Sequence, residues 1–132
     1  MEEKNMHEAK KYKAKQKLIK GGFMSEEDNI IDGFQVNYRE NLLGGIGQWQ
    51  QGWWAYFTEE KMVAIRALAN IVIPYKNIRS VGKCRYVFFL PVGISITFEH
   101  PESGEEVTEK FYMMKGKKWR QFLADKAGVE IS

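Results

Sequence analysis

The stretch from residue 52 to residue 81 limits what this chain can fold into more than any other part of the sequence. It contains three short strand-like runs, 52–57, 62–67 and 71–73, separated by turns of only three or four residues. A parallel return between strands needs a crossover of about a dozen residues, so runs joined by turns this short pair antiparallel. The stretch therefore predicts an antiparallel meander.

Further strands are expected on both sides of this meander. Apolar and polar residues roughly alternate between residues 29 and 39, with an irregularity at Gly33. Pro74 removes a backbone donor and ends the third run, and a single helical turn is expected directly after it. The remaining strands are expected at residues 79–89, 94–99 and 106–113. The sequence thus predicts seven strands.

The last element is a helix over residues 117–127, which Gly128 ends. Trp119, Phe122 and Leu123 recur at the spacing that places large apolar groups on one helical stripe. Seven strands followed by one such helix predict a mainly β fold. We expect a seven-stranded split barrel of two near-orthogonal antiparallel sheets, with the open corner capped by the C-terminal helix.

Four groups of residues, in this order, carry a family resemblance. They are Gly52 with Tyr56, Phe57 and Thr58; Ile73 and Pro74 with Ile78 and Val81; residues 93–97; and Trp119 with Phe122 and Leu123. Their order and spacing resemble GRAM and bacterial PH-like domains, over roughly residues 29–125. The resemblance implies a PH-like fold. Two positions depart from the family pattern, where Asn77 replaces an acidic residue and Lys61 replaces an arginine.

The first 20 residues differ from the rest in charge. Seven lysines and three glutamates give them a net charge of +4, so the chain's total of +3 leaves −1 for the remainder. We predict a basic helical or flexible leader at residues 1–22, closed by glycines, and a single PH/GRAM-like domain at residues 23–132. Three states are open for the leader: a solvated or partly disordered segment, a basic arm on an anionic surface, or a helix docked on the domain.

Catalytic and metal-binding patterns are missing from the sequence. A zinc site needs several His or Cys ligands at characteristic spacings, whereas this chain has Cys84 and two distant histidines, His7 and His100. No nucleophile has a base beside it, and the glycines of residues 44–47 lack the Lys-Ser/Thr of a phosphate loop. We therefore expect a non-catalytic protein without cofactors.

A group of apolar residues around the first predicted hairpin is the candidate partner surface. Its members are Leu42, Leu43, Ile46, Trp49, Trp53 and Trp54. Neighbouring strand residues point to opposite faces, so Trp53 and Trp54 are not both in the core. The outward tryptophan is either covered by a helix or offered to a protein partner or a second copy of the chain. The aliphatic residues of the loop either pack on the barrel rim or contact that partner.

The second candidate site is the anionic-surface contact of the leader, formed by Lys10, Lys11, Lys13, Lys15, Lys17 and Lys20. PH domains that bind phosphoinositides place cations in the loop joining their first two strands. Residues 40–51 contain neither Lys nor Arg, so that pocket is not expected here. Nucleic acid is not expected either, because the domain is nearly neutral.

The predicted function is that of a binding module for protein partners or self-association. The alternative is a peripheral membrane module that uses the lysines of the leader for weak contact with anionic lipid. A single cysteine, the lack of an apolar signal core and the lack of an apolar run of ~18 residues favour the cytoplasm.

Overall fold

The computed structural model of the chain describes residues 7–39, 49–85 and 92–132. In this part of the chain the strands are β1 (Ile30–Arg39), β2 (Trp49–Thr58), β3 (Lys61–Arg66), β4 (Ala69–Pro74), β5 (Ile78–Cys84), β6 (Gly93–Glu99) and β7 (Glu106–Tyr112). The helices are α1 (Glu8–Lys20), the single 3-10 turn η1 (Tyr75–Asn77) and α2 (Gly116–Ala127).

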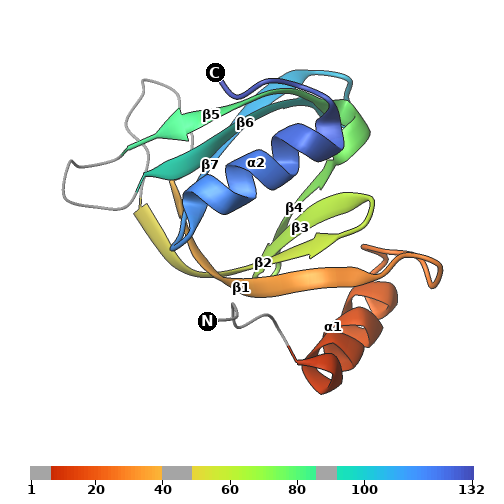
Figure 1. Cartoon of the computed structure of the whole chain (residues 1–132). Coiled ribbons are helices and arrows are strands. Elements are labelled where there is room, and N and C mark those ends of the chain that lie inside the picture. Colours follow the sequence, from red (N-terminus) through yellow and green to blue (C-terminus); the bar gives the residue numbers. More distant parts are fainter. Residues whose placement is uncertain (1–6, 40–48, 86–91) are drawn as a thin grey trace.

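The seven described strands form one antiparallel sheet in the order β4-β3-β2-β1-β7-β6-β5. Strand β1 pairs with β2 from Ile30 to Arg39, but its pairing with β7 is limited to residues 37–39. This short contact joins two halves of the sheet, and α2 lies between them (Figure 1). The predicted mainly β fold with one C-terminal helix is confirmed, and the two expected sheets are continuous through β1.

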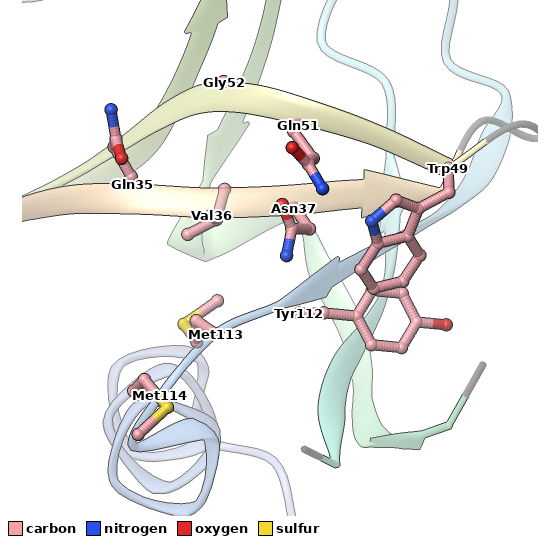
Figure 2. Close-up of a pocket in the computed structure, with 9 residues that line it drawn as sticks. All are labelled: Gln35, Val36, Asn37, Trp49, Gln51, Gly52, Tyr112, Met113 and Met114. Atoms are coloured by element: carbon pink, nitrogen blue, oxygen red, sulfur yellow. The ribbon is translucent and has the colours of Figure 1, made fainter. Parts of the chain in front are cut away.

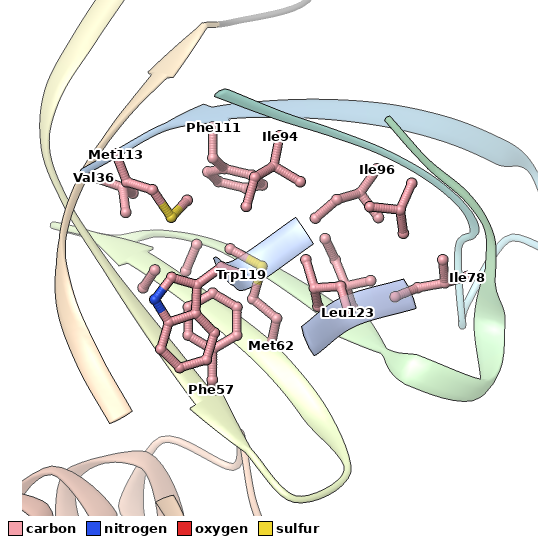
Figure 3. Packing of buried hydrophobic residues seen from close by; sticks show 14 of the residues in the cluster. Val36, Phe57, Met62, Ile78, Ile94, Ile96, Phe111, Met113, Trp119 and Leu123 are labelled. Atoms are coloured by element: carbon pink, nitrogen blue, oxygen red, sulfur yellow. The ribbon is translucent and has the colours of Figure 1, made fainter. Parts of the chain in front are cut away.

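Helix α2 fills the space between the two halves with aromatic side chains. The Trp119 ring stacks on Phe57, with 4.2 Å between ring centroids and 15° between planes. Phe34 of β1 lies 5.4 Å from Trp119, and Phe122 meets Trp119 edge to face. Leu123, one residue further along α2, faces Ile78 and Ile96 of the opposite half in the same core (Figure 3).

Two turns show how well local sequence signals located the elements. The helical turn expected after Pro74 is present as η1, where the Tyr75 hydroxyl donates to the Thr58 carbonyl at 2.7 Å. The turn between β3 and β4 was expected at residues 68–70, but Arg66 pairs with Ala69, so Ala67 and Leu68 make it. Ala67 has a φ of 52°, a conformation that glycine or asparagine normally signals.

Two strand boundaries also differ from expectation. Strand β2 begins at Trp49, whereas the sequence predicted a start at Gly52. Gly52 lies inside the strand and has a φ of 84°, a conformation that glycine adopts readily. Strand β5 ends at Cys84, and residues 86–89 of the strand expected at 79–89 lie outside the described residues.

Helix α1 packs against the sheet as a docked element. Leu18 is completely buried and Ala14 nearly so, in a second cluster with Ile30, Tyr56 and Val63. The helix lies beside β1 on the side away from α2 (Figure 1). Gly22 closes it with a φ of 79°, and the next amide donates to the Leu18 carbonyl at 2.8 Å. Of the three states considered for this segment, the structure has the docked helix.

Replacing Leu18 with alanine tests this docking. The change opens a cavity under α1 and should lower the free energy of unfolding by about 2–5 kcal/mol. Urea denaturation measures it. The matched control is Tyr12→Ala on the exposed face of the same helix, expected to change stability by no more than about 0.5 kcal/mol. Equal effects of the two substitutions would mean that α1 does not rest on the sheet.

Replacing Trp119 with alanine tests the central packing. Loss of a buried aromatic ring between Phe57 and Phe34 should cost about 3–5 kcal/mol in urea denaturation. Gln121→Ala, on the exposed side of α2, is the control and should cost less than about 0.5 kcal/mol. A loss below about 1 kcal/mol for Trp119→Ala would refute the packing of α2 between the two halves.

Candidate functional site

Two adjoining hollows follow β1 on the surface of the molecule, and we call them together the β1 groove. The first has a volume of about 580 Å³ and lies between Val36, Trp49, Gly52 and Tyr112 (Figure 2). The second, of about 490 Å³, lies between Gly33, Phe34, Trp54 and Trp119. Gln35 and Met114 line both hollows, so the two are neighbours along β1.

The β1 groove exists because β7 leaves β1 after a short contact. Asn37 pairs with Tyr112, and the chain then turns into α2 at Lys115, whose φ is 64°. Residues 32–36 of β1 therefore pair with β2 on one side and with no described strand on the other. The sequence places Met113 and Met114 in this short turn, and Met114 is 78% exposed.

The main chain of β1 is open toward the β1 groove. The Gly33 amide donates to the Asp32 carboxylate at 2.8 Å, so it points away from β2. In an antiparallel pair, amides alternate between facing the partner and facing away. The Gln35 amide consequently faces the same edge as that of Gly33, while the Phe34 amide between them faces β2. Gln35 can thus offer backbone hydrogen bonds to a ligand.

The two neighbouring tryptophans, Trp53 and Trp54, point to opposite faces of β2. Trp53 is only 3% exposed, packs 4.9 Å from the Tyr38 ring, and donates its indole N–H to Gln50 at 3.0 Å. Trp54 points the other way, stacks on Tyr56 and is 38% exposed. The prediction that Trp53 belongs to a partner surface is therefore wrong, because this residue is the one that faces the core.

The remaining candidate partner residues lie in or beyond the β1 groove. Trp49 is half-buried and packs on Tyr112, with 4.7 Å between ring centroids. Burial raises the pKa of the Tyr112 hydroxyl to about 12, so the group is neutral at physiological pH. Leu42, Leu43 and Ile46, with residues 40–48 generally, lie outside the described residues.

Charged side chains stand on both sides of the second hollow. His7 and Lys10 come from the start of α1, and Lys115 comes from the turn before α2. Asp32 also lines this hollow and contributes a negative charge, and its carboxylate accepts the Gly33 amide. The second hollow therefore joins large apolar side chains with two lysines and one carboxylate.

The lysines predicted to contact an anionic surface do not act as one group. Lys10 lines the β1 groove, and Lys13, Lys17 and Lys20 are exposed on α1. Lys11 lies 3.6 Å from Glu8. Lys15 donates to the Glu26 carbonyl at 2.8 Å and to the Asn29 side chain at 3.2 Å, so it ties α1 to the following loop.

Three side chains capable of acid–base chemistry, those of Cys84, Glu109 and His100, are partly buried or make hydrogen bonds within the fold. Burial raises the pKa of the Cys84 thiol, which disfavours the reactive thiolate. Burial also raises the pKa of Glu109, whose carboxylate accepts the Tyr38 hydroxyl at 2.7 Å. His100 accepts the Glu102 and Ser103 amides and so shapes the turn after β6.

The described residues contain neither a metal cluster nor a membrane-spanning helix. Among residues 7–39, 49–85 and 92–132, no three His, Cys, Asp or Glu side chains gather as a metal site. No helix in these ranges has the length and apolar character needed to cross a bilayer.

Comparison with known proteins found likeness at the level of the fold. No protein-family model matches the chain, and neither does any curated protein. Among solved structures, the C-terminal domain of an unknown protein from Leishmania infantum aligns with a TM-score of 0.63 and 13% identity, covering 88% of this chain and 95% of that one.

Two human structures are also similar. The hSac2 domain of the phosphoinositide phosphatase Sac2 aligns with a TM-score of 0.53 and 8% identity, over 97% of this chain and 88% of that one. The PH domain of pleckstrin homology domain-containing protein family A member 5 aligns with a TM-score of 0.50 and 13% identity, over 83% and 85%. The chain therefore has a PH-like fold.

Proposed function

We propose that this chain is a non-catalytic binding module whose β1 groove takes an extended segment of a partner protein. The observation that carries the proposal is the combination of two adjoining, partly apolar hollows with an open main-chain edge at Gln35. An added strand gains affinity from main-chain hydrogen bonds and specificity from pockets for its side chains. Trp54 and Trp49 are of the residue type that often dominates binding energy at protein interfaces.

The size and charge of the β1 groove suit such a segment. Each hollow has the volume of a typical ligand site, and the two follow one another along β1. Lys10 and Lys115 on the rims favour a partner that carries acidic residues beside its apolar ones. The partner is either another protein or a second copy of this chain.

We also propose a family within the PH-like folds and a cellular location for this chain. Within PH-like folds we favour a GRAM relationship, because the motif around Pro74 and the strand from Gly93 follow that family's order. A single cysteine and the lack of an apolar run long enough to span a membrane favour the cytoplasm.

Peripheral membrane binding through α1 is the second candidate. Exposed Lys13, Lys17 and Lys20 favour an anionic bilayer, at about 1 kcal/mol for each basic residue near the surface. However, Leu18 and Ala14 already pack on the sheet, so α1 has little apolar surface left to insert. Protein binding is therefore the preferred function.

Selection from a displayed library of random peptides on the full chain tests the preferred function. We expect enriched peptides with apolar and acidic residues, and we expect Trp54→Ser with Met114→Ser to weaken their binding roughly tenfold or more. Fluorescence anisotropy of a labelled peptide measures the affinity. The control is Leu68→Ser in the turn between β3 and β4, where the side chain is 100% exposed and lines neither hollow.

Sedimentation of the wild-type chain covers the case of a second copy. A dimer that is lost in the Trp54→Ser, Met114→Ser variant and kept in the Leu68→Ser control identifies the chain itself as the partner. If no peptide is enriched and the chain remains a monomer, or if the groove variant behaves as the control does, the proposal is wrong.

A further inference from the structure

One methionine lines both hollows of the β1 groove. Met114 and Gln35 are the two residues that the hollows share. The Met114 side chain is apolar but 78% exposed, and it comes directly before the turn into α2 at Lys115 (Figure 2). In the free chain this side chain is therefore open to solvent beside both hollows.

The neighbouring methionine, Met113, has the opposite surroundings. It also lines the first hollow, but it is only 4% exposed and lies beside Val36 in the core (Figure 3). Met24 and Met62 are buried as well, at 6% and 0% exposed. Among the methionines that the structure describes, Met114 is thus the one that a reagent in solution reaches freely.

Exposure matters because the thioether of methionine reacts with peroxides. Oxidation gives a sulfoxide, which turns a flexible apolar side chain into a polar one, and reductases reverse the change. Beside Met114, the second hollow is lined by the rings of Phe34, Trp54 and Trp119. Oxidation of Met114 would place a strong hydrogen-bond acceptor beside these rings.

We propose that Met114 is an oxidation site that regulates the β1 groove: hydrogen peroxide converts it to the sulfoxide, which binds the partner more weakly. A lone pair of the Met114 sulfur attacks one peroxide oxygen, the O–O bond breaks and an S–O bond forms. The proton of the transferred oxygen moves to the departing oxygen, which leaves as water. The sulfur loses two electrons and the peroxide gains them. The inference rests on the proposed function, since it concerns regulation of the same groove.

The weaker binding follows from what a bound segment covers. A segment that lies over both hollows removes Met114 from water, so a sulfoxide there loses its hydrogen bonds to water. Burying a polar group without a replacement hydrogen bond is unfavourable, whereas burying a thioether is favourable. We expect oxidation to weaken partner binding roughly tenfold. The melting temperature of the free chain should hardly change, because Met114 is exposed there.

The first experiment maps the oxidised residue and needs no partner. The full chain is treated with hydrogen peroxide, sampled over time, digested and analysed by mass spectrometry, with fragment ions separating Met113 from Met114. We expect Met114 to gain one oxygen roughly ten times faster than the buried methionines. Met1 and Met6, which lie outside the described residues, are followed on peptides of their own.

The second experiment measures binding before and after peroxide. The probe is a labelled peptide enriched from the displayed library, or sedimentation if the chain is its own partner. Wild-type affinity should fall roughly tenfold and return after treatment with the two methionine sulfoxide reductases. Met114→Leu has no thioether at this position, so its affinities before and after peroxide should be equal. Met113→Leu is the matched control, and it should show the same tenfold loss as the wild type.

The outcomes separate this inference from the proposed function. Rapid oxidation of Met114, with a reversible loss of affinity that Met114→Leu lacks, supports the inference. Equal oxidation rates at Met114 and the buried methionines would overturn it, as would an unchanged wild-type affinity or the same loss in Met114→Leu. If no peptide is enriched and no dimer forms, the proposed function fails and regulation of the groove fails with it, while the mapping still shows whether Met114 is oxidised selectively.

Discussion

Strand β1 belongs to both halves of the sheet, and the rest of the structure depends on how it is shared. It pairs with β2 over ten residues of chain but with β7 only at residues 37–39. The two halves therefore diverge on either side of this contact. On the inner side, Trp119 and Phe34 fill the wedge. On the outer side the same divergence leaves the β1 groove, so the packing of the core and the opening of the candidate site have one cause.

The docking of α1 on the sheet fixes where the basic residues of the N-terminal segment lie. Because Leu18 is buried against Tyr56 and Val63, α1 is held in place and brings His7 and Lys10 to the rim of the β1 groove. The helix thus covers Tyr56 while its neighbour Trp54 stays accessible. The lysines, for which a basic arm was one of the three states considered, are distributed between the groove and the solvent-facing side of α1.

Local patterns predicted the elements well, because short turns, Pro74 and the aromatic stripe of α2 act within a few residues. The same patterns did not decide which face of β2 is inside, since Trp53 and Trp54 are equally large and apolar. The buried stripe of α1 was missed because Ala14 and Leu18 are few among lysines. The cavity that Lys83 and Arg120 line together was missed because the two residues are far apart in sequence, and the packing of α2 on β5 brings them together.

Amide hydrogen exchange along β1, followed by NMR in the full chain, tests most directly whether the two halves diverge in solution. Phe34 and Gln35 are adjacent, but only the Phe34 amide faces β2, whereas the Gln35 amide faces the β1 groove. An open groove predicts slow exchange at Phe34 and much faster exchange at Gln35. Equally slow exchange at both residues would mean that β1 is paired on both sides, and would contradict the groove on which the proposed function rests.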